Sequence, residues 1–259
     1  MSNLSICVAG ATGWTGSALV DAVAEADDLD LRSAVSRSAA GGEVAGAPVY
    51  ASVAEALDGV DVLIDYTSHD VVKANALAAI ERGVAVVIGT SGLSASDYAD
   101  IDAAARERGV GVIAAGNFSV TAAMAQAAAL LAARHLPSWE VIDYAKATKA
   151  DAPSGTAREL AERLGEVRPP EVALPVEDTA GAPEARGATI GGAQVHSLRL
   201  SSFTVSTEVV FGLPDERLSI RHDAGSSAAP YVAGTLLAAR AAPARTGLTR
   251  GLDTLLLDG

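Results

Sequence analysis

The sequence predicts an α/β fold in two parts: a parallel sheet covered by helices, and an α+β part built on an open, mixed sheet. Short apolar runs alternate with helical patterns through the first half of the chain, which is typical of parallel strands joined by helical crossovers. These runs are nearly all apolar rather than alternating, as expected for strands covered on both faces. The pattern changes after Phe118. We therefore expect one domain over residues 1–118 and 226–259, and a second over residues 119–225.

The elements of the first domain follow from apolar spacing. Segments of five to seven mainly apolar residues predict strands over residues 4–9, 29–35, 60–66, 84–88 and 110–115. Spacing on one helical face predicts helices over residues 17–26, 53–57, 71–82 and 95–107. Gly83 follows the third of these helices and is a typical C-terminal signal.

The second domain begins with a long alanine-rich helix that runs to about residue 135. Alternating segments then predict strands over residues 141–145, 195–200, 203–211 and 218–222, and a helix begins near residue 156. A proline-rich stretch over residues 167–186 has no clear period. The last helix, over residues 231–241, is expected to return to the first domain.

Composition excludes several classes of function. The formal net charge is −13, the reverse of what nonspecific nucleic-acid binding or an anionic membrane surface requires. Cys7 is the single cysteine, so no disulfide forms within the chain, and we expect a buried thiol in a cytoplasmic protein. The uncharged stretch over residues 109–133 contains glycines and polar side chains, so we expect a buried strand and helix rather than a membrane span. No cluster of His, Cys, Asp and Glu has metal-ligand spacing, and no metal is expected.

A glycine-rich turn joins the first strand to the first helix. It has the pattern G-x-x-G-x-x-G, formed by Gly10, Ala11, Thr12, Gly13, Trp14, Thr15 and Gly16. The three glycines allow a tight turn, a close approach of the backbone to a pyrophosphate, and close packing of helix on strand. The helix N-terminus supplies N–H groups and partial positive charge. The turn therefore predicts a Rossmann-like domain that binds NAD(P)H.

The end of the second strand indicates which nucleotide is preferred. An NAD-binding site usually places Asp or Glu there to hold the ribose hydroxyls. This chain instead has Ser36, Arg37 and Ser38, which suit a 2′-phosphate. We expect NADPH, with NADH as the alternative if Arg37 only stacks on adenine or faces solvent.

A second polar segment precedes the helix that begins near Thr156. Lys149, hydroxyls from Ser154 and Thr156, and the amides of a helix N-terminus form a cradle for a carboxylate or phosphate. The alternative is an ordinary helix cap.

The segment from Lys149 to Ala157, K-A-D-A-P-S-G-T-A, resembles the signature of the dihydrodipicolinate reductase family. The resemblance covers nearly the whole chain and includes the glycine turn, Asp65-Tyr66-Thr67, Gly89-Thr90-Ser91-Gly92, Ala115-Gly116-Asn117-Phe118-Ser119, Arg186-Gly187-Ala188, Val195-His196-Ser197-Leu198-Arg199, Glu208-Val209-Val210-Phe211-Gly212 and Ile220-Arg221-His222-Asp223.

This resemblance implies an oxidoreductase of the bacterial diaminopimelate and lysine biosynthesis route, assembled as a homotetramer through the sheet of the second domain. It implies that Thr67, Gly89, Thr90, Ser91, Ala115, Gly116, Asn117 and Phe118 contribute to the cofactor site. It also implies that Lys149, Ser154, Gly155 and Thr156 hold a carboxylated small-molecule substrate.

One departure from the family pattern bears on the chemistry. The family has two adjacent histidines before the lysine, as E-x-H-H-x-x-K, and the first is its proposed general acid. This chain has Ala145 and Lys146 at those positions, and alanine transfers no proton. The histidines that are present, His69, His135, His196 and His222, lie outside this loop.

Three hypotheses follow from the departure. In the first, the chain reduces a different carboxylated cyclic imine or enamine, with Lys149, Lys146 or Tyr144 placing charge or a proton. In the second, it performs the lysine-pathway reduction with a substitute acid. In the third, it binds NADPH without catalysis. An iminium substrate is already protonated and needs no acid from the protein, so the loss of the histidine costs little in that case.

Overall fold

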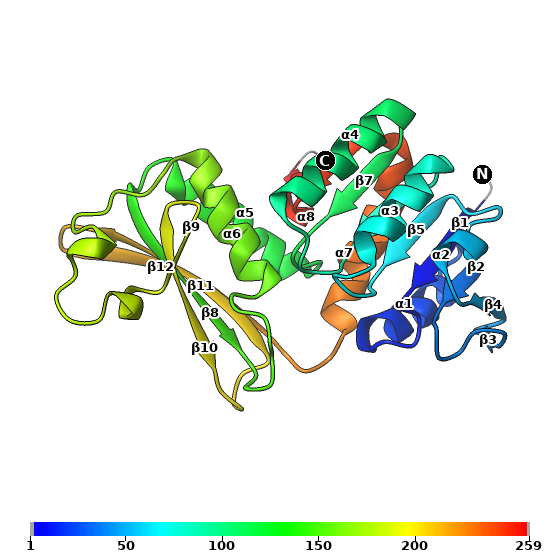
Figure 1. The fold of residues 1–259 in the computed structure, drawn as a ribbon, viewed down its shortest axis with the longest axis horizontal. Coiled ribbons are helices and arrows are strands. Elements are labelled where there is room, and N and C mark those ends of the chain that lie inside the picture. Colours follow the sequence, from blue (N-terminus) through cyan, green and yellow to red (C-terminus); the bar gives the residue numbers. More distant parts are fainter. Residues whose placement is uncertain (1–2, 258–259) are drawn as a thin grey trace. The chain divides into compact units, whose positions relative to one another are not determined.

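The computed structural model describes residues 3–257, and the chain contacts divide into two compact units. The first unit holds the residues up to Val120 and those from Ala228 onward, and the second holds Thr121–Ser227. Each unit is built on its own sheet (Figure 1).

The first unit contains an eight-stranded sheet that is parallel except at one edge. Its strand order is β13-β7-β6-β5-β1-β2-β4-β3, and only β3 pairs antiparallel to its neighbour. The strands are β1 (Leu4–Ala9), β2 (Leu29–Val35), β3 (Glu43–Val44), β4 (Ala47–Tyr50), β5 (Val62–Asp65), β6 (Ala85–Ile88), β7 (Gly111–Ala114) and β13 (Gly247–Arg250). Strand order reverses at β1, because β2 lies on one side of it and β5 on the other. The carboxyl ends of these three strands therefore form a switch point, where ligands of such sheets bind.

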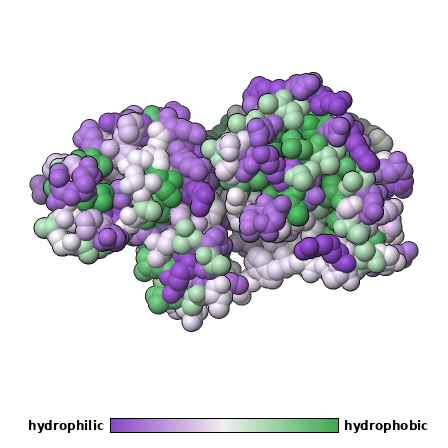
Figure 2. Space-filling view, in the orientation of Figure 1, coloured by the Kyte–Doolittle hydropathy of each residue, from purple (hydrophilic) through white to green (hydrophobic). Residues whose placement is uncertain are grey.

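Helices cover both faces of this sheet, as the apolar strands predicted. They are α1 (Trp14–Glu25), α2 (Val53–Ala56), α3 (Val72–Glu81), α4 (Ala95–Arg108), α7 (Ala229–Ala241) and α8 (Leu252–Leu257). One core cluster joins α2, α3 and α4 to alternate strand residues such as Leu63, Val86 and Val112. Cys7 belongs to this cluster, and burial raises the pKa of its thiol to about 12. The outer surface of α4 is hydrophilic in Figure 2, in keeping with its many charged residues.

The second unit contains a five-stranded mixed sheet in the order β12-β11-β8-β10-β9. Its strands are β8 (Ser138–Ala145), β9 (Ala188–Ile190), β10 (Ala193–Arg199), β11 (Val205–Leu213) and β12 (Glu216–Ala224). Only β8 and β10 pair in parallel. Two helices, α5 (Val120–Ala133) and α6 (Gly155–Val167), lie on one face of this sheet (Figure 1), with the short 3₁₀ turns η1 (Val176–Asp178) and η2 (Pro183–Arg186) nearby in sequence.

Strict alternation along β8 assigns its side chains to the two faces. Trp139, Val141, Asp143 and Ala145 are buried and point toward the helices, whereas the residues between them are half-buried. No helix within residues 3–257 is long and apolar enough to span a membrane. The same described residues contain no group of three or more His, Cys, Asp or Glu that could hold a metal ion.

Candidate functional site

The glycine turn is fixed by contacts that exclude larger residues. Gly10 has a φ of +82°, and a Cβ atom there would overlap the carbonyl oxygen of Tyr66. A Cβ atom on Gly16 would overlap the carbonyl oxygen of Gly10. Helix α1 begins at Trp14, earlier than residue 17 as predicted, so Gly13 is its N-cap. No side chain caps this helix, so its first amides are presented to a ligand.

A cleft of about 790 Å³ opens beside this turn. It is lined by Gly10, Thr12, Gly13, Val35, Ser36, Arg37, Ser38, Ala51, Ser52, Val53, Tyr66, Thr67, Ser68, Val71 and Asn75. The structure thus brings together the glycine turn, the end of β2 and the end of β5. The hydroxyls of Thr12 and Ser36 lie 2.8 Å apart, and Ser36 and Ser38 lie 3.2 Å apart. Within residues 3–257 no acidic residue lines the cleft, and the lining residue Arg37 is exposed.

Asp65, at the end of β5, organises the loops beside this cleft, a role that the sequence analysis did not assign to it. It is fully buried, and its Oδ1 accepts hydrogen bonds from the amide and the hydroxyl of Thr67 at 2.9 and 2.6 Å. The Thr90 hydroxyl donates to the same oxygen at 3.1 Å, and Asn75 donates to Oδ2 at 2.8 Å. One carboxylate therefore ties the Thr67 loop to the Thr90 loop.

The other predicted cofactor residues lie at the same edge of the sheet, after β6 and β7, but do not line the cleft. Gly89 has no room for a Cβ atom because the Tyr66 ring lies against it. The Tyr66 hydroxyl lies 2.8 Å from that of Thr235. Ser91 is exposed, Thr90 and Gly116 are half-buried, and Ala115 and Phe118 are buried. Asn117 Oδ1 accepts a hydrogen bond from the Ser119 amide at 2.8 Å.

The remaining residues of the glycine turn differ in exposure. Ala11 is buried and Thr15 is half-buried. Trp14 is 56% exposed, with its ring 5.9 Å from that of Tyr231 in an edge-to-face arrangement. An aromatic side chain thus stands in solvent at the start of the helix that faces the cleft.

A buried carboxylate, Asp143 on β8, also organises the second polar segment. Ser154 donates to Asp143 through its amide at 2.9 Å and its hydroxyl at 2.6 Å. Arg199 pairs with the same carboxylate at 2.8 Å, and Ser197 donates to it at 3.1 Å. Ser154 also caps α6 by accepting from the Ala157 amide. The Ser154 hydroxyl, predicted to contact a ligand, therefore holds the turn in place, and Gly155 and Thr156 form the first turn of α6.

The candidate proton donors lie in different surroundings. Lys149 is half-buried, and its Nζ lies 2.7 Å from Asp151 Oδ1, while Lys146 is exposed. Ala145 is fully buried on the helix side of β8. Tyr144 lies on the opposite face of the sheet, where its hydroxyl donates to Glu208 at 2.9 Å. The burial of its hydroxyl and the nearby Glu208 raise the pKa of Tyr144. This arrangement separates Tyr144 from the Lys149–Thr156 segment.

Comparisons with known proteins agree over the whole chain. Residues 4–118 match the family model of the dihydrodipicolinate reductase N-terminus, and residues 117–256 match that of its C-terminus. A 4-hydroxy-tetrahydrodipicolinate reductase from Mycobacterium sp. (strain KMS) is 37% identical over 254 residues, covering 98% of this chain and 99% of the relative. One from Synechococcus elongatus is 35% identical and covers 98% of each chain. The structure is also similar to the dipicolinate-bound dihydrodipicolinate reductase from Paenisporosarcina sp. TG-14, with a TM-score of 0.77, 25% identity, and coverage of 97% and 99% of the two chains.

Proposed function

We propose that the substrate of this chain is a small cyclic imine or enamine that carries carboxylates. The chain belongs to the dihydrodipicolinate reductase family and is an NAD(P)H-dependent oxidoreductase acting on a C=N or conjugated C=C bond. The observation that carries this proposal is the turn from Lys149 to Thr156. Asp143 accepts two hydrogen bonds from Ser154, so the N-terminus of α6 has a set position. Backbone amides at a helix N-terminus and a nearby lysine are suited to a carboxylate.

In the proposed reaction, Gly155, Thr156 and Lys149 bind and orient the substrate. Bound NAD(P)H supplies the hydride. The Lys149 ammonium lies 2.7 Å from Asp151 Oδ1, so a substrate carboxylate must compete with Asp151 for it. That competition favours substrates with more than one carboxylate, since a second group also engages the helix amides. Dipicolinate, a dicarboxylate, is bound in the similar Paenisporosarcina structure.

The source of the proton is limited by the positions of the candidate donors. Ala145 presents only a buried methyl group, and Tyr144 lies on the other sheet face with its hydroxyl bonded to Glu208. Of the three side chains predicted to place charge or a proton, Lys146 and Lys149 remain. An iminium carbon accepts hydride without further protonation, so a substrate that binds in this form is the one best matched to the chain.

We further propose that NADPH is preferred to NADH. The hydroxyls of Ser36 and Ser38, the Arg37 guanidinium and the lack of an acidic lining residue support a site for a 2′-phosphate. The substitution Arg37→Ala is expected to weaken NADPH binding by about tenfold to a hundredfold, as for loss of a charge-assisted hydrogen bond, and to leave NADH binding nearly unchanged. Arg32→Ala is the matched control, because Arg32 is on β2, the strand that precedes Arg37, and donates to Asp58 away from the cleft. Fluorescence titration measures both nucleotides, and tighter wild-type binding of NADH would contradict the preference.

The substrate class is tested by the purified protein, NADPH, 4-hydroxy-tetrahydrodipicolinate and a panel of cyclic imines with and without carboxylates. Absorbance of the reduced nicotinamide gives the rate. We expect turnover of carboxylated compounds only. Efficient turnover of 4-hydroxy-tetrahydrodipicolinate would identify the lysine-pathway reaction itself and remove the need for a different substrate. Tight NADPH binding with no turnover of any compound would contradict the proposal and favour a binding role.

A further inference from the structure

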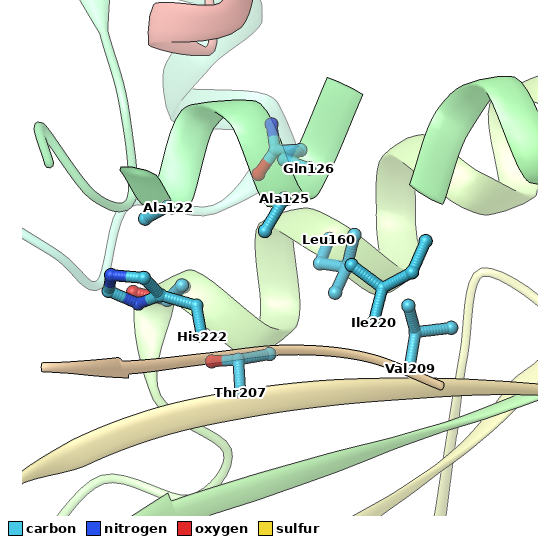
Figure 3. A pocket seen from close by; sticks show the side chains of 9 residues that line it. Ala122, Ala125, Gln126, Leu160, Thr207, Val209, Ile220 and His222 are labelled. Carbon is cyan, nitrogen blue, oxygen red and sulfur yellow. The ribbon is translucent and has the colours of Figure 1, made fainter. Parts of the chain in front are cut away.

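A small cavity lies between the helices and the sheet of the second unit, and the catalytic proposal does not use it. Its volume is about 20 Å³, which is enough for one water molecule and too small for an organic ligand. Figure 3 shows side chains from α5, α6, β11 and β12 converging on it. Apolar walls come from Ala122, Ala125 and Leu160, and polar atoms come from Gln126, Thr156, Thr207 and His222.

Thr207 is the unusual residue of this cavity. Its side chain is 6% exposed, and its hydroxyl has no hydrogen-bond partner in the part of the chain that the structure describes. A buried hydroxyl without a hydrogen-bond partner destabilises the fold, because it has lost its hydrogen bonds to water and gained none in return. Such groups in proteins are usually satisfied by ordered water where there is room.

His222 lies directly opposite Thr207 in the register of β11 and β12, on the same sheet face. Figure 3 shows the two side chains beside each other below Ala122. The Nε2 atom of His222 is 3.0 Å from the Thr121 hydroxyl, so its contact with α5 uses one ring nitrogen. Burial lowers the pKa of His222, which keeps the ring neutral at pH 7. A neutral ring offers its Nδ1 for a second hydrogen bond.

Neighbouring residues connect Thr207 and His222 to the Lys149–Thr156 turn, which binds substrate in the function proposed above. Thr207 is opposite Asp143 in the β11–β8 register, and Asp143 holds Ser154. Thr156 lines the cavity itself. A water molecule in the cavity therefore has four polar side chains within its walls, and buried water typically makes about two to four hydrogen bonds.

We propose that this cavity binds one ordered water molecule, bonded to the Thr207 hydroxyl and to Nδ1 of His222, and that Thr207 and His222 act through this water as positioning residues for Thr156. The role in substrate binding rests on the function proposed above, whereas the water site does not. Neither residue is assigned to contact substrate.

The water site is tested directly by high-resolution crystal structures of the wild type and Thr207→Val. Valine keeps the shape of threonine and removes the hydroxyl. We expect one water within hydrogen-bond distance of Thr207 and His222 in the wild type, and its loss in the variant. An empty cavity in the wild type would overturn the proposal. In solution, ¹⁵N chemical shifts of the His222 ring are expected to change in Thr207→Val, and unchanged shifts would likewise overturn it.

The positioning role is tested by the affinity of the NADPH-bound protein for dipicolinate. Thr207→Val is expected to weaken dipicolinate binding about tenfold, the effect of one lost water-mediated hydrogen bond, with NADPH affinity unchanged. Thr207→Ser restores the hydroxyl and is expected to restore affinity to within about twofold of the wild type. Ser219→Ala is the matched control, because Ser219 is on β12 and lies on the opposite sheet face.

Equal dipicolinate affinity in the wild type and Thr207→Val would overturn the positioning role. Failure of the wild type itself to bind dipicolinate would contradict the proposed substrate class and, with it, the positioning role. The water site would then be decided by the crystal structures and the His222 shifts alone, so the two failures are distinguishable.

Discussion

At the residue scale, two buried carboxylates hold in place the segments that carry the candidate ligand-binding residues. Asp65 is the last residue of β5 and Asp143 lies near the end of β8, and each accepts hydrogen bonds from the segment that follows its strand and from more distant residues. The sequence analysis assigned neither carboxylate this role, because an acidic residue in or at the end of a strand has no local pattern that indicates its distant partners. Their effect is to fix the loops that carry Thr67 and Thr156. The residues expected to touch ligands are thus held by residues that do not.

The buried methyl group of Ala145 leads to a prediction about rate. The double substitution Ala145→His and Lys146→His restores the histidine pair implied by the family resemblance. If the chain has diverged in substrate, this variant is expected to reduce 4-hydroxy-tetrahydrodipicolinate about a hundredfold faster or more than the wild type, the usual contribution of a positioned acid. Steady-state kinetics with both the lysine-pathway compound and the best cyclic imine measure the change.

Lys146→His alone is the control, since it leaves Ala145 in place. A double variant that gains nothing over the wild type, while remaining folded and binding NADPH, would show that the site lacks more than an acid.

At the element scale, the long apolar runs were predictable and the short edge elements were not. The bounds of β1 and β2 agree with the sequence prediction at both ends, because each strand is a mainly apolar segment followed by glycine or serine residues of a turn. The sequence prediction lacked β3, β4, β9, β13 and α8. Strands of two to four residues at a sheet edge carry too few apolar positions for a period, and they form because a neighbouring strand is already in place.

The candidate site likewise combines features that the sequence predicted with features that it did not. The glycine turn and Arg37 were found from spacing alone, and the structure places them around one cleft. The role of Asp143 depends on its contacts with residues 154, 197 and 199, which are distant from it in the sequence. No local sequence pattern indicates such contacts. The assignment of Tyr144 to the other sheet face follows from the register of β8, which the sequence suggested only by alternation.

Helix α6 depends on its buried carboxylate, which gives a prediction about stability. Asp143→Asn is expected to lower the free energy of unfolding by about 3 kcal/mol, because it leaves the partly buried Arg199 without its charge partner. It is also expected to weaken dipicolinate binding. Chemical denaturation measures the first effect and titration the second. Asp223→Asn is the matched control: its pair with Arg221 is exposed, so its loss should cost less than about 1 kcal/mol. Equal stabilities for the two variants would contradict the role given to Asp143.

At the scale of the whole molecule, we propose that the chain assembles as a homotetramer through the five-stranded sheet. Helices α5 and α6 cover one face of this sheet, and no described helix covers the other. That face mixes apolar residues such as Ile142 and Val210 with ion pairs such as Arg186–Glu140. Apolar side chains on an uncovered sheet face favour an interface with a second copy.

Light scattering is expected to give a mass about four times the 26.0 kDa of one chain. Ile142→Lys places a charge in the proposed interface and should reduce the mass, with no change in NADPH binding. Leu131→Lys, at an exposed leucine of α5, is the matched control and should leave the mass unchanged. A monomeric wild type would contradict the assembly.

The central claim is that this chain transfers hydride from a nicotinamide to a carboxylated cyclic C=N or conjugated C=C compound. Its most direct test is a reaction with NADPH that carries deuterium at the transferable position of nicotinamide C4, followed by mass spectrometry of the product. We expect one deuterium in the reduced ring of a carboxylated substrate and none when the carboxylates are absent. Full retention of deuterium in the nucleotide, with carboxylated substrates present and NADPH bound, would contradict it.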